Sequence, residues 1–274
     1  MTLEDHAGDI VAKARAALGV SVEEAAALAG LAVDTHRRFE QTGQGSPPPR
    51  FDRLAARLGL HAQRLAAIAG GWLPRPQALN RWEELRQITT REGMAVNCYL
   101  IWDAATREAA LFDTGWEAQP VFELIGGNEL ELKHLFITHG HHDHIAALAP
   151  LQRRFPRAKV HSGPPLVPAD PQSPAGDVIE IGGLRVMARP TPGHSEEGTS
   201  YLIQGWMGSA PPVVVVGDAL FAGSMGRTVE AAFETAKQAI RKQILSLPAA
   251  TLICPGHGPM TTVGEEKAHN PFFA

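Results

Sequence analysis

Residues 138–145 read Thr-His-Gly-His-His-Asp-His-Ile, and this stretch decides how the rest of the chain is interpreted. It continues the apolar run 134–138, which we expect to be a buried strand. The ligand-type side chains in this single turn are His139, His141, Asp143 and His144. Imidazole and carboxylate together suit Zn, Fe or Mn better than Ca or Mg. The stretch therefore indicates a metal site at a strand end, with a histidine-rich surface loop as the plainer alternative.

Three later turns each bring one more ligand-type side chain to the end of an apolar strand, beside a glycine or proline. These side chains, with the runs before them, are His194 after 185–189, Asp218 after 213–216 and His257 after 251–254. Functional residues gather in such loops because a rigid scaffold holds them in place. Seven such side chains from four turns can hold two metal ions, so we expect a two-metal site.

The composition is that of a globular protein. Of 274 residues, 44% are hydrophobic and 20% are charged, and the net charge is −4. That charge argues against a chain that mainly neutralises phosphates. Only two cysteines occur, Cys98 and Cys254, which excludes a disulfide framework. We expect a cytoplasmic protein without signal peptide or membrane span, since it has no basic start and no apolar run of about 20 residues.

The chain changes character near residue 72. Residues 1–71 read as short helices, one of them opened by a Ser21–Glu24 capping box and closed by Gly30, and 72–80 reads as a linker. Strands and helices alternate over 81–274, which indicates a layered α/β sandwich able to fold without the first 72 residues. Among the early helices, one is expected at about 34–40. Later helices are expected at about 117–125, 145–154 and 229–246. The expected strands are 96–102, 109–112, 134–138, 159–161, 178–181, 185–189, 199–203, 213–216 and 251–254.

The order of the ligand-type residues resembles the signature of the metallo-β-lactamase superfamily: His-x-His-x-Asp-His, then a lone His, a lone Asp and a lone His. The resemblance extends over about residues 85–274 and implies a four-layer αββα sandwich with the metals at one edge. The ligand sets that it implies are His139, His141 and His194 for one metal, Asp143, His144 and His257 for the other, and Asp218 bridging both. The expected cofactors are two divalent ions, zinc first, with iron or manganese as alternatives.

Within the superfamily, the chain is similar to the compact glyoxalase II-like hydrolases. The stretches that carry this similarity are 97–100 (Asn-Cys-Tyr-Leu), 113–115 (Asp-Thr-Gly), 217–227, 255–259 (Pro-Gly-His-Gly-Pro) and 270–273 (Asn-Pro-Phe-Phe). The similarity implies hydrolysis of a thioester or other activated ester, with a metal-bound hydroxide as nucleophile and Asp143 as the catalytic residue that orients it. The glutathione-binding extension of glyoxalase II proper has no counterpart after His257, and the Arg-Thr-Asp stretch of many relatives reads Arg227-Thr228-Val229 here. The similarity therefore leaves the thiol part of the substrate open.

Two further residues are candidates for substrate contact. Arg227 would meet an anionic group, with an ordinary salt bridge as the alternative, and Trp116 would line the mouth of the site. Asp113 is expected in a supporting or turn role rather than as a ligand. No Gly-x-Ser-x-Gly elbow occurs, which argues against a serine hydrolase.

Residues 10–69 resemble the phage-repressor type of helix-turn-helix domain. The stretches that carry this resemblance are 15–26, 28–31 and 51–60. It implies that the helix at 34–40 enters the major groove and offers Arg37 and Arg38 to DNA. Residues 1–72 carry eight basic and eight acidic side chains, however, whereas DNA binders usually show a basic excess. We therefore favour a role in homodimerisation, or in covering the active site, over DNA binding.

Three functions follow from these observations. The leading one is a two-metal hydrolase that acts on a small-molecule thioester or ester. The first alternative is a persulfide dioxygenase, which shares the fold but uses a single iron. The second is a DNA-binding regulator whose metal domain senses a metabolite. Metal content and oxygen consumption separate the first two, and DNA binding that depends on residues 1–72 identifies the third.

Overall fold

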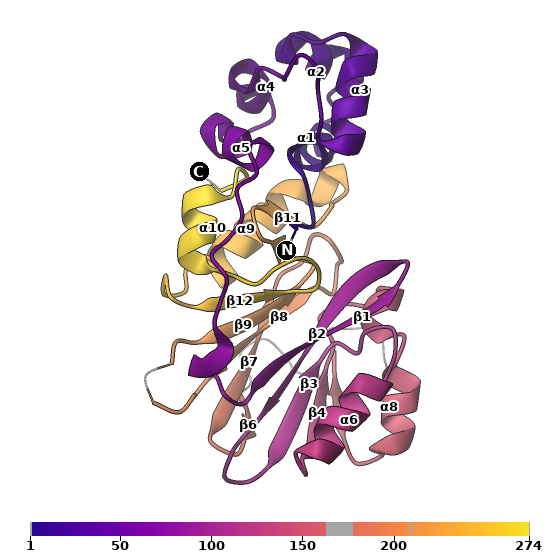
Figure 1. Ribbon diagram of the computed structural model, residues 1–274, viewed down its shortest axis with the longest axis vertical. Helices are drawn as coiled ribbons and strands as arrows, with labels where there is room; N and C mark the ends of the chain where they lie inside the picture. The colour runs from indigo at the N-terminus through magenta and orange to yellow at the C-terminus, as the bar shows by residue number, and fades with distance from the viewer. Residues whose placement is uncertain (1, 163–177, 209, 274) are drawn as a thin grey trace.

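Two β-sheets face each other at the centre of the molecule, and helices cover their outer faces (Figure 1). The computed structural model describes residues 2–162, 178–208 and 210–273. The first sheet contains, in spatial order, β1 (Leu85–Glu92), β2 (Met94–Trp102), β3 (Glu108–Phe112), β4 (Glu131–Phe136) and β5 (Lys159–His161). The second contains β13 (Thr261–Thr262), β12 (Leu252–Pro255), β9 (Val213–Gly217), β8 (Thr199–Gln204), β7 (Leu184–Pro190) and β6 (Val178–Ile181). The layered sandwich expected from the sequence is confirmed.

The helices fall into three groups along the chain. The N-terminal group is α1 (Ala7–Ala17), α2 (Val22–Ala29), α3 (Val33–Thr42), α4 (Phe51–Arg57) and α5 (Ala62–Ala69). Those on the side of the first sheet are α6 (Gln119–Gly127), α7 (His142–Ile145) and α8 (Leu148–Arg154). Those on the side of the second sheet are α9 (Phe233–Gln243) and α10 (Val263–His269). Short 3-10 turns, η1 (Leu79–Arg81) and η2 (Glu230–Ala232), and the hairpin of β10 (Leu220–Phe221) and β11 (Ser224–Met225) complete the described structure.

Large side chains that alternate along the strands fill the space between the two sheets. Tyr99, Phe112 and Phe136 from the first sheet pack there against Val186 and Tyr201 from the second, and all five are buried. A second buried cluster lies between the first sheet and helices α6 and α8. The sandwich is therefore a rigid support for the loops at its edge.

The strand pairing brings distant turns to one edge of the sandwich. In the first sheet, β3 and β4 are parallel, with Phe112 opposite Phe136, so the turns that follow them begin side by side. In the second sheet, β9 and β12 are parallel, with Gly217 opposite Pro255. Since the carboxyl ends of neighbouring parallel strands open onto the same edge, residues 218 and 257 become neighbours.

Most expected elements are present, with shifted ends, and the differences have physical reasons. The strand β1 was not predicted, because its sequence Leu-Arg-Gln-Ile-Thr-Thr-Arg-Glu is mostly polar, as an edge strand allows. The helix expected at about 145–154 is present as α8 but begins later, at Leu148, because Ile145 ends the separate short helix α7. The helix expected at about 34–40 begins one residue earlier, at Val33, with Ala32 as its N-cap. The Ser21 cap and the left-handed Gly30 at the ends of α2 are confirmed.

Helices α1–α5, coloured indigo to purple in Figure 1, stack beyond α9 and α10 and share a core with them. One cluster of buried side chains runs from Ile10 and Leu65 to Ile240 and Phe272. Arg64 of α5 also donates hydrogen bonds to the carbonyls of residues 270 and 273, at 3.1 and 2.5 Å. The division into 1–71, 72–80 and 81–274 stays a prediction, and this packing makes a common unfolding transition the expected behaviour.

In the described residues, no helix is long and apolar enough to cross a membrane.

We predict that Leu65→Ala destabilises both parts of the chain together. Leu65 is fully buried, so the substitution should cost about 2–5 kcal/mol. The five tryptophans all follow α5, so their fluorescence reports mainly on the sandwich, whereas circular dichroism reports on all helices. Both signals should shift to lower denaturant by the same amount. Leu73→Ala, at a position 45% exposed, is the control and should leave both unchanged. An unshifted fluorescence midpoint in Leu65→Ala would show that the two parts unfold independently.

Candidate metal centre

The histidine-aspartate turn lies directly beyond β4, at the edge where the parallel strands end. His139 and His141 precede the short helix α7, and Asp143 and His144 lie within it. His139 and His144 are buried, whereas His141 is exposed. A strand followed at once by a helix thus points four side chains toward one place.

Three imidazoles from two loops converge in what we call the first ligand group, which is His139, His141, His194 and Asp218. His141 Nδ1 lies 3.1 Å from His139 Nε2 and 3.0 Å from His194 Nε2. Ligands about 2.0–2.1 Å from a tetrahedral zinc ion lie roughly 3.3 Å from one another. The spacing of these three nitrogens is therefore close to that of a metal-bound set.

A second ligand group contains Asp143, His144 and His257. Asp143 Oδ2 lies 3.2 Å from His257 Nε2 and 3.6 Å from His144 Nε2. Asp218 stands between the two groups, with its Oδ1 3.3 Å from His144 Nε2 and its Oδ2 3.5 Å from His194 Nε2 and 3.4 Å from His257 Nε2. All seven residues singled out from the sequence are thus brought together, in the two sets that the resemblance implied.

The donor set fits divalent metal ions. The three nitrogens of the first group face one another, and protons alone cannot satisfy all of their lone pairs. Between the two groups, the buried His144 Nε2 and Asp218 Oδ1 have no hydrogen-bond partner among the described residues. Buried polar atoms are rarely left without a partner, and a shared cation would satisfy both of these.

Electrostatics differ between the two ligand groups. Burial lowers the pKa of His139 to about 2, so its ring is neutral and has a free lone pair. Burial also opposes the charged form of His144, but the carboxylates of Asp113 and Asp218 outweigh it and raise the pKa of His144 to about 10. Asp143 and Asp218 likewise overcome burial and raise the pKa of His257 to about 11. Metal ions that bind here would displace the protons of His144 and His257 and supply the positive charge in their place.

The outer nitrogens of the ligand imidazoles are held by hydrogen bonds that aim the inner ones. Asp113 Oδ2 accepts from His144 Nδ1 at 2.8 Å, and its carboxylate also accepts from the amide and hydroxyl of Thr138. His257 Nδ1 is 2.6 Å from the carbonyl of residue 95, and His194 Nδ1 is 2.9 Å from that of residue 227. Asp113 therefore has the supporting position expected from the sequence, and such partners orient metal ligands.

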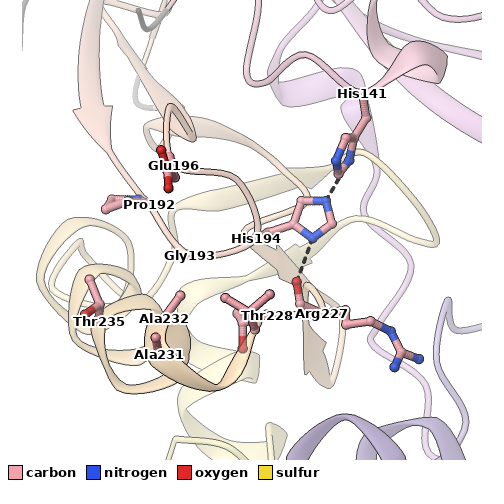
Figure 2. A pocket seen from close by; sticks show the side chains of 11 residues that line it. His141, Pro192, Gly193, His194, Glu196, Arg227, Thr228, Ala231, Ala232 and Thr235 are labelled. Carbon is pink, nitrogen blue, oxygen red and sulfur yellow. Dashed lines mark hydrogen bonds between the residues drawn. The ribbon is translucent and has the colours of Figure 1, made fainter. Parts of the chain in front are cut away.

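A cavity of about 770 Å³ adjoins the first ligand group, and its lining is mostly apolar (Figure 2). His141 and His194 belong to its lining, together with Pro192, Glu196, Val229 and Ala232. We call it the apolar cavity. Arg227 also lines it, and its exposed guanidinium has no ion pair among the described residues.

Trp116 lies beside the site but does not line this cavity. Its Nε1 donates to the carbonyl of Met94 at 3.0 Å, and its ring meets that of His142 edge-on at 5.6 Å. The side chain braces the β1–β2 hairpin against the turn that follows β4. A direct contact of Trp116 with substrate stays a prediction.

Helix α3 presents little free positive charge. His36 is buried, and Arg37 lies 3.2 Å from Asp34 and 3.3 Å from Glu23. Arg38 is exposed and belongs to a shallow cavity of about 400 Å³. The structure contains the expected N-terminal helices, while the helix-turn-helix assignment and the DNA contacts stay predictions.

We predict that Asp113→Asn weakens metal retention without unfolding the chain. Asn is nearly isosteric and tolerates the left-handed backbone of this residue, at φ 56°, but it removes the charge that holds His144. Loss of such a partner typically costs 10–100-fold in metal affinity. Competition with a chromophoric chelator measures the affinity, and circular dichroism verifies the fold. Asp103→Asn, in an exposed turn, is the matched control. Equal affinity in Asp113→Asn and the control would contradict the assigned role.

Comparison with known proteins agrees with this geometry. Residues 91–257 match the family model of the metallo-beta-lactamase superfamily. The hydroxyacylglutathione hydrolase GloC of Haemophilus influenzae is 32% identical over 201 residues, which cover 65% of this chain and 92% of the relative. Among solved structures, ETHE1 from Myxococcus xanthus has 31% identity and a TM-score of 0.60 over 68% of this chain and 83% of its own. TTHA1623, crystallised in a di-iron-bound form, has 28% identity and a TM-score of 0.54 over 69% of this chain and 100% of its own. With its matched family model, its two-sheet fold and its histidine-aspartate centre, the chain belongs to the metallo-beta-lactamase superfamily.

Proposed function

We propose that this protein is a two-metal hydrolase of thioesters or other activated esters. The observation that carries the proposal is the pair of ligand groups joined at Asp218 and flanked by an apolar cavity. The similarity to a hydroxyacylglutathione hydrolase supports a thioester as the substrate. Membership of the superfamily makes a metal-dependent hydrolase the general class.

Each ligand group would hold one divalent ion. His139, His141 and His194 would bind the first, Asp143, His144 and His257 the second, and Asp218 both. Metals in such a pair supply Lewis acidity, which activates water for attack and polarises the carbonyl that it attacks. We propose zinc, with iron or manganese as alternatives, because imidazole and carboxylate ligands suit all three.

Asp143 is the proposed catalytic residue. Its Oδ2 faces His257 and His144, whereas its Oδ1 has no hydrogen-bond partner among the described residues. Oδ1 is therefore free to accept a hydrogen bond from the attacking water and orient it toward the carbonyl carbon. Thiolates are weakly basic leaving groups and need little help from a general acid.

The apolar cavity would take the acyl part of the substrate. Val229, 70% exposed to solvent, and Ala232 present hydrocarbon to a space that begins at His141 and His194. Burial of hydrocarbon contributes about 0.8 kcal/mol per methylene, so a chain of several carbons gains substantially there. Arg227, at the same cavity, would contact an anionic group on the substrate.

The alternative function is persulfide oxidation with a single iron, which the similarity to ETHE1 from Myxococcus xanthus supports. The complete second ligand group favours two metals instead. A metabolite-sensing DNA-binding regulator is less favoured, because residues 1–72 have no net charge and Arg37 is already paired. We also propose that the protein forms a homodimer through its N-terminal helices and that it is located in the cytoplasm.

We predict that the metal-loaded protein hydrolyses short acyl thioesters and that Asp218→Ala abolishes this activity. Asp218 joins both ligand groups, so its loss should remove metal. It should also reduce kcat/KM at least 1,000-fold, which corresponds to a rise of about 4 kcal/mol in the activation free energy. Metal analysis and a thiol-trapping assay measure the two effects. Full activity in Asp218→Ala would refute the two-metal mechanism. Oxygen consumption with a persulfide, without thioester hydrolysis, would establish the alternative.

We further predict that Val229→Glu selects against long acyl groups. A charge in the apolar cavity should lower kcat/KM for an octanoyl thioester about tenfold or more, and that for the acetyl thioester less than twofold. Val178→Glu is the matched control, because Val178 is also exposed, at 48%, but lies on β6 away from the cavity. Equal losses for both thioesters would show that the cavity does not hold the acyl chain.

A further inference from the structure

The segment before α1 is fastened to the metal-bearing loops by a buried ionic contact. Asp5 is 6% exposed and pairs with Lys13 of α1. Asp5 also accepts a hydrogen bond from Ser224 Oγ at 2.6 Å, and Lys13 Nζ donates to the carbonyl of Met225 at 3.0 Å. Ser224 and Met225 form β11, shortly after Asp218 in the chain. This contact fixes residues 2–5 at the side of the proposed active site.

Glu4 consequently lies beside the second ligand group. A Cβ built on Gly258, next to His257, would come 3.0 Å from the backbone nitrogen of Glu4 and 3.3 Å from its Cβ. Partial burial raises the pKa of Glu4, and its carboxylate also interacts electrostatically with His257 and Asp218. A helix-bearing extension thus contributes a charged side chain next to the reacting groups.

Residues 2–4 also close a cavity of about 490 Å³, which we call the N-terminal cavity. Gly258 and Ala95 line it, and the carbonyl of Ala95 lies 2.6 Å from His257 Nδ1. It therefore lies on the outer side of His257, next to the second ligand group, and none of the seven ligand residues lines it. The apolar cavity, by contrast, is lined by His141 and His194 of the first group. The two cavities thus lie beside different ligand groups, which fits a substrate with two arms.

The N-terminal cavity carries two opposite charges. Glu4 and Arg91 both line it and are exposed, and neither belongs to an ion pair or a side-chain hydrogen bond among the described residues. By contrast, Asn97 in the same lining is fully engaged, since its Oδ1 accepts from Gln87 and Thr89. One carboxylate and one guanidinium are thus available to a ligand.

We propose that the N-terminal cavity binds the polar leaving arm of the substrate, with Glu4 contacting a cationic group and Arg91 an anionic group on that arm. The inference rests on the proposed hydrolase function. It makes residues 2–5 part of the substrate site, and it gives the helical extension a role in specificity. The arm belongs to the chemical class of small zwitterionic thiols or alcohols.

The test uses three thioesters of one acyl group whose leaving arms differ in charge: thiocholine, which is cationic, 3-mercaptopropionate, which is anionic, and N-acetylcysteamine, which is neutral. Glu4→Gln should lower kcat/KM for the thiocholine thioester about fivefold, as expected for a partly exposed ion pair. Arg91→Gln should do the same for the mercaptopropionate thioester. Hydrolysis of the neutral thioester, which offers no charge to either residue, should fall less in each variant than hydrolysis of the charged thioester that the replaced residue contacts. Glu180→Gln and Arg185→Gln, an exposed pair of positions opposite each other on β6 and β7, are the matched controls.

Calorimetric binding of the corresponding non-hydrolysable thioethers separates this inference from the proposed function. The same charge-selective losses in affinity should appear in Glu4→Gln and Arg91→Gln. Hydrolysis of all three thioesters with unchanged ratios in both variants would overturn the inference and leave the hydrolase intact. Equal losses for all three arms would reduce Glu4 and Arg91 to structural roles and equally overturn it. Charge-selective thioether binding without any hydrolysis would support the cavity and refute the hydrolase.

Discussion

The Asp218 carboxylate, held among three imidazole nitrogens at 3.3–3.5 Å, is the point on which the rest of the structure depends. Burial of a carboxylate is costly unless positive charge surrounds it, and here that charge comes from His144 and His257. The three imidazoles belong to segments that follow three different strands of the sandwich, and these strands hold them in place. The fold therefore serves to concentrate negative charge and free lone pairs at one edge, which is the environment that a pair of divalent cations needs.

Much of this site could be predicted from the sequence, because its ligands follow buried strands. Each apolar run, such as Val213–Gly217, identifies a strand without any knowledge of its neighbours, and the residue after it is then placed at a sheet edge. The order and spacing of His139, His141 and Asp143 indicated metal binding at this edge. The supporting role of Asp113 could also be predicted, since Asp113 directly follows the strand β3 as the ligands follow theirs.

The parts that could not be predicted depend on contacts between residues far apart in the chain. Asp5 and Ser224 are separated by 219 positions, and neither sequence neighbourhood indicates that they meet. The strand β1 escaped prediction because its polar face does not alternate cleanly. The apparent linker at 72–80 suggested independent parts, yet the buried cluster from Ile10 to Phe272 joins them. Tertiary packing, rather than local pattern, decides such features.

The central claim is that one carboxylate joins two metal positions, and anomalous diffraction from metal-loaded crystals tests it most directly. Two peaks about 3.5–4 Å apart are predicted, one bounded by His139, His141 and His194 and the other by Asp143, His144 and His257, with Asp218 reaching both. A single peak at the first group, with His144 and His257 still turned to the carboxylates at full metal saturation, would contradict the account.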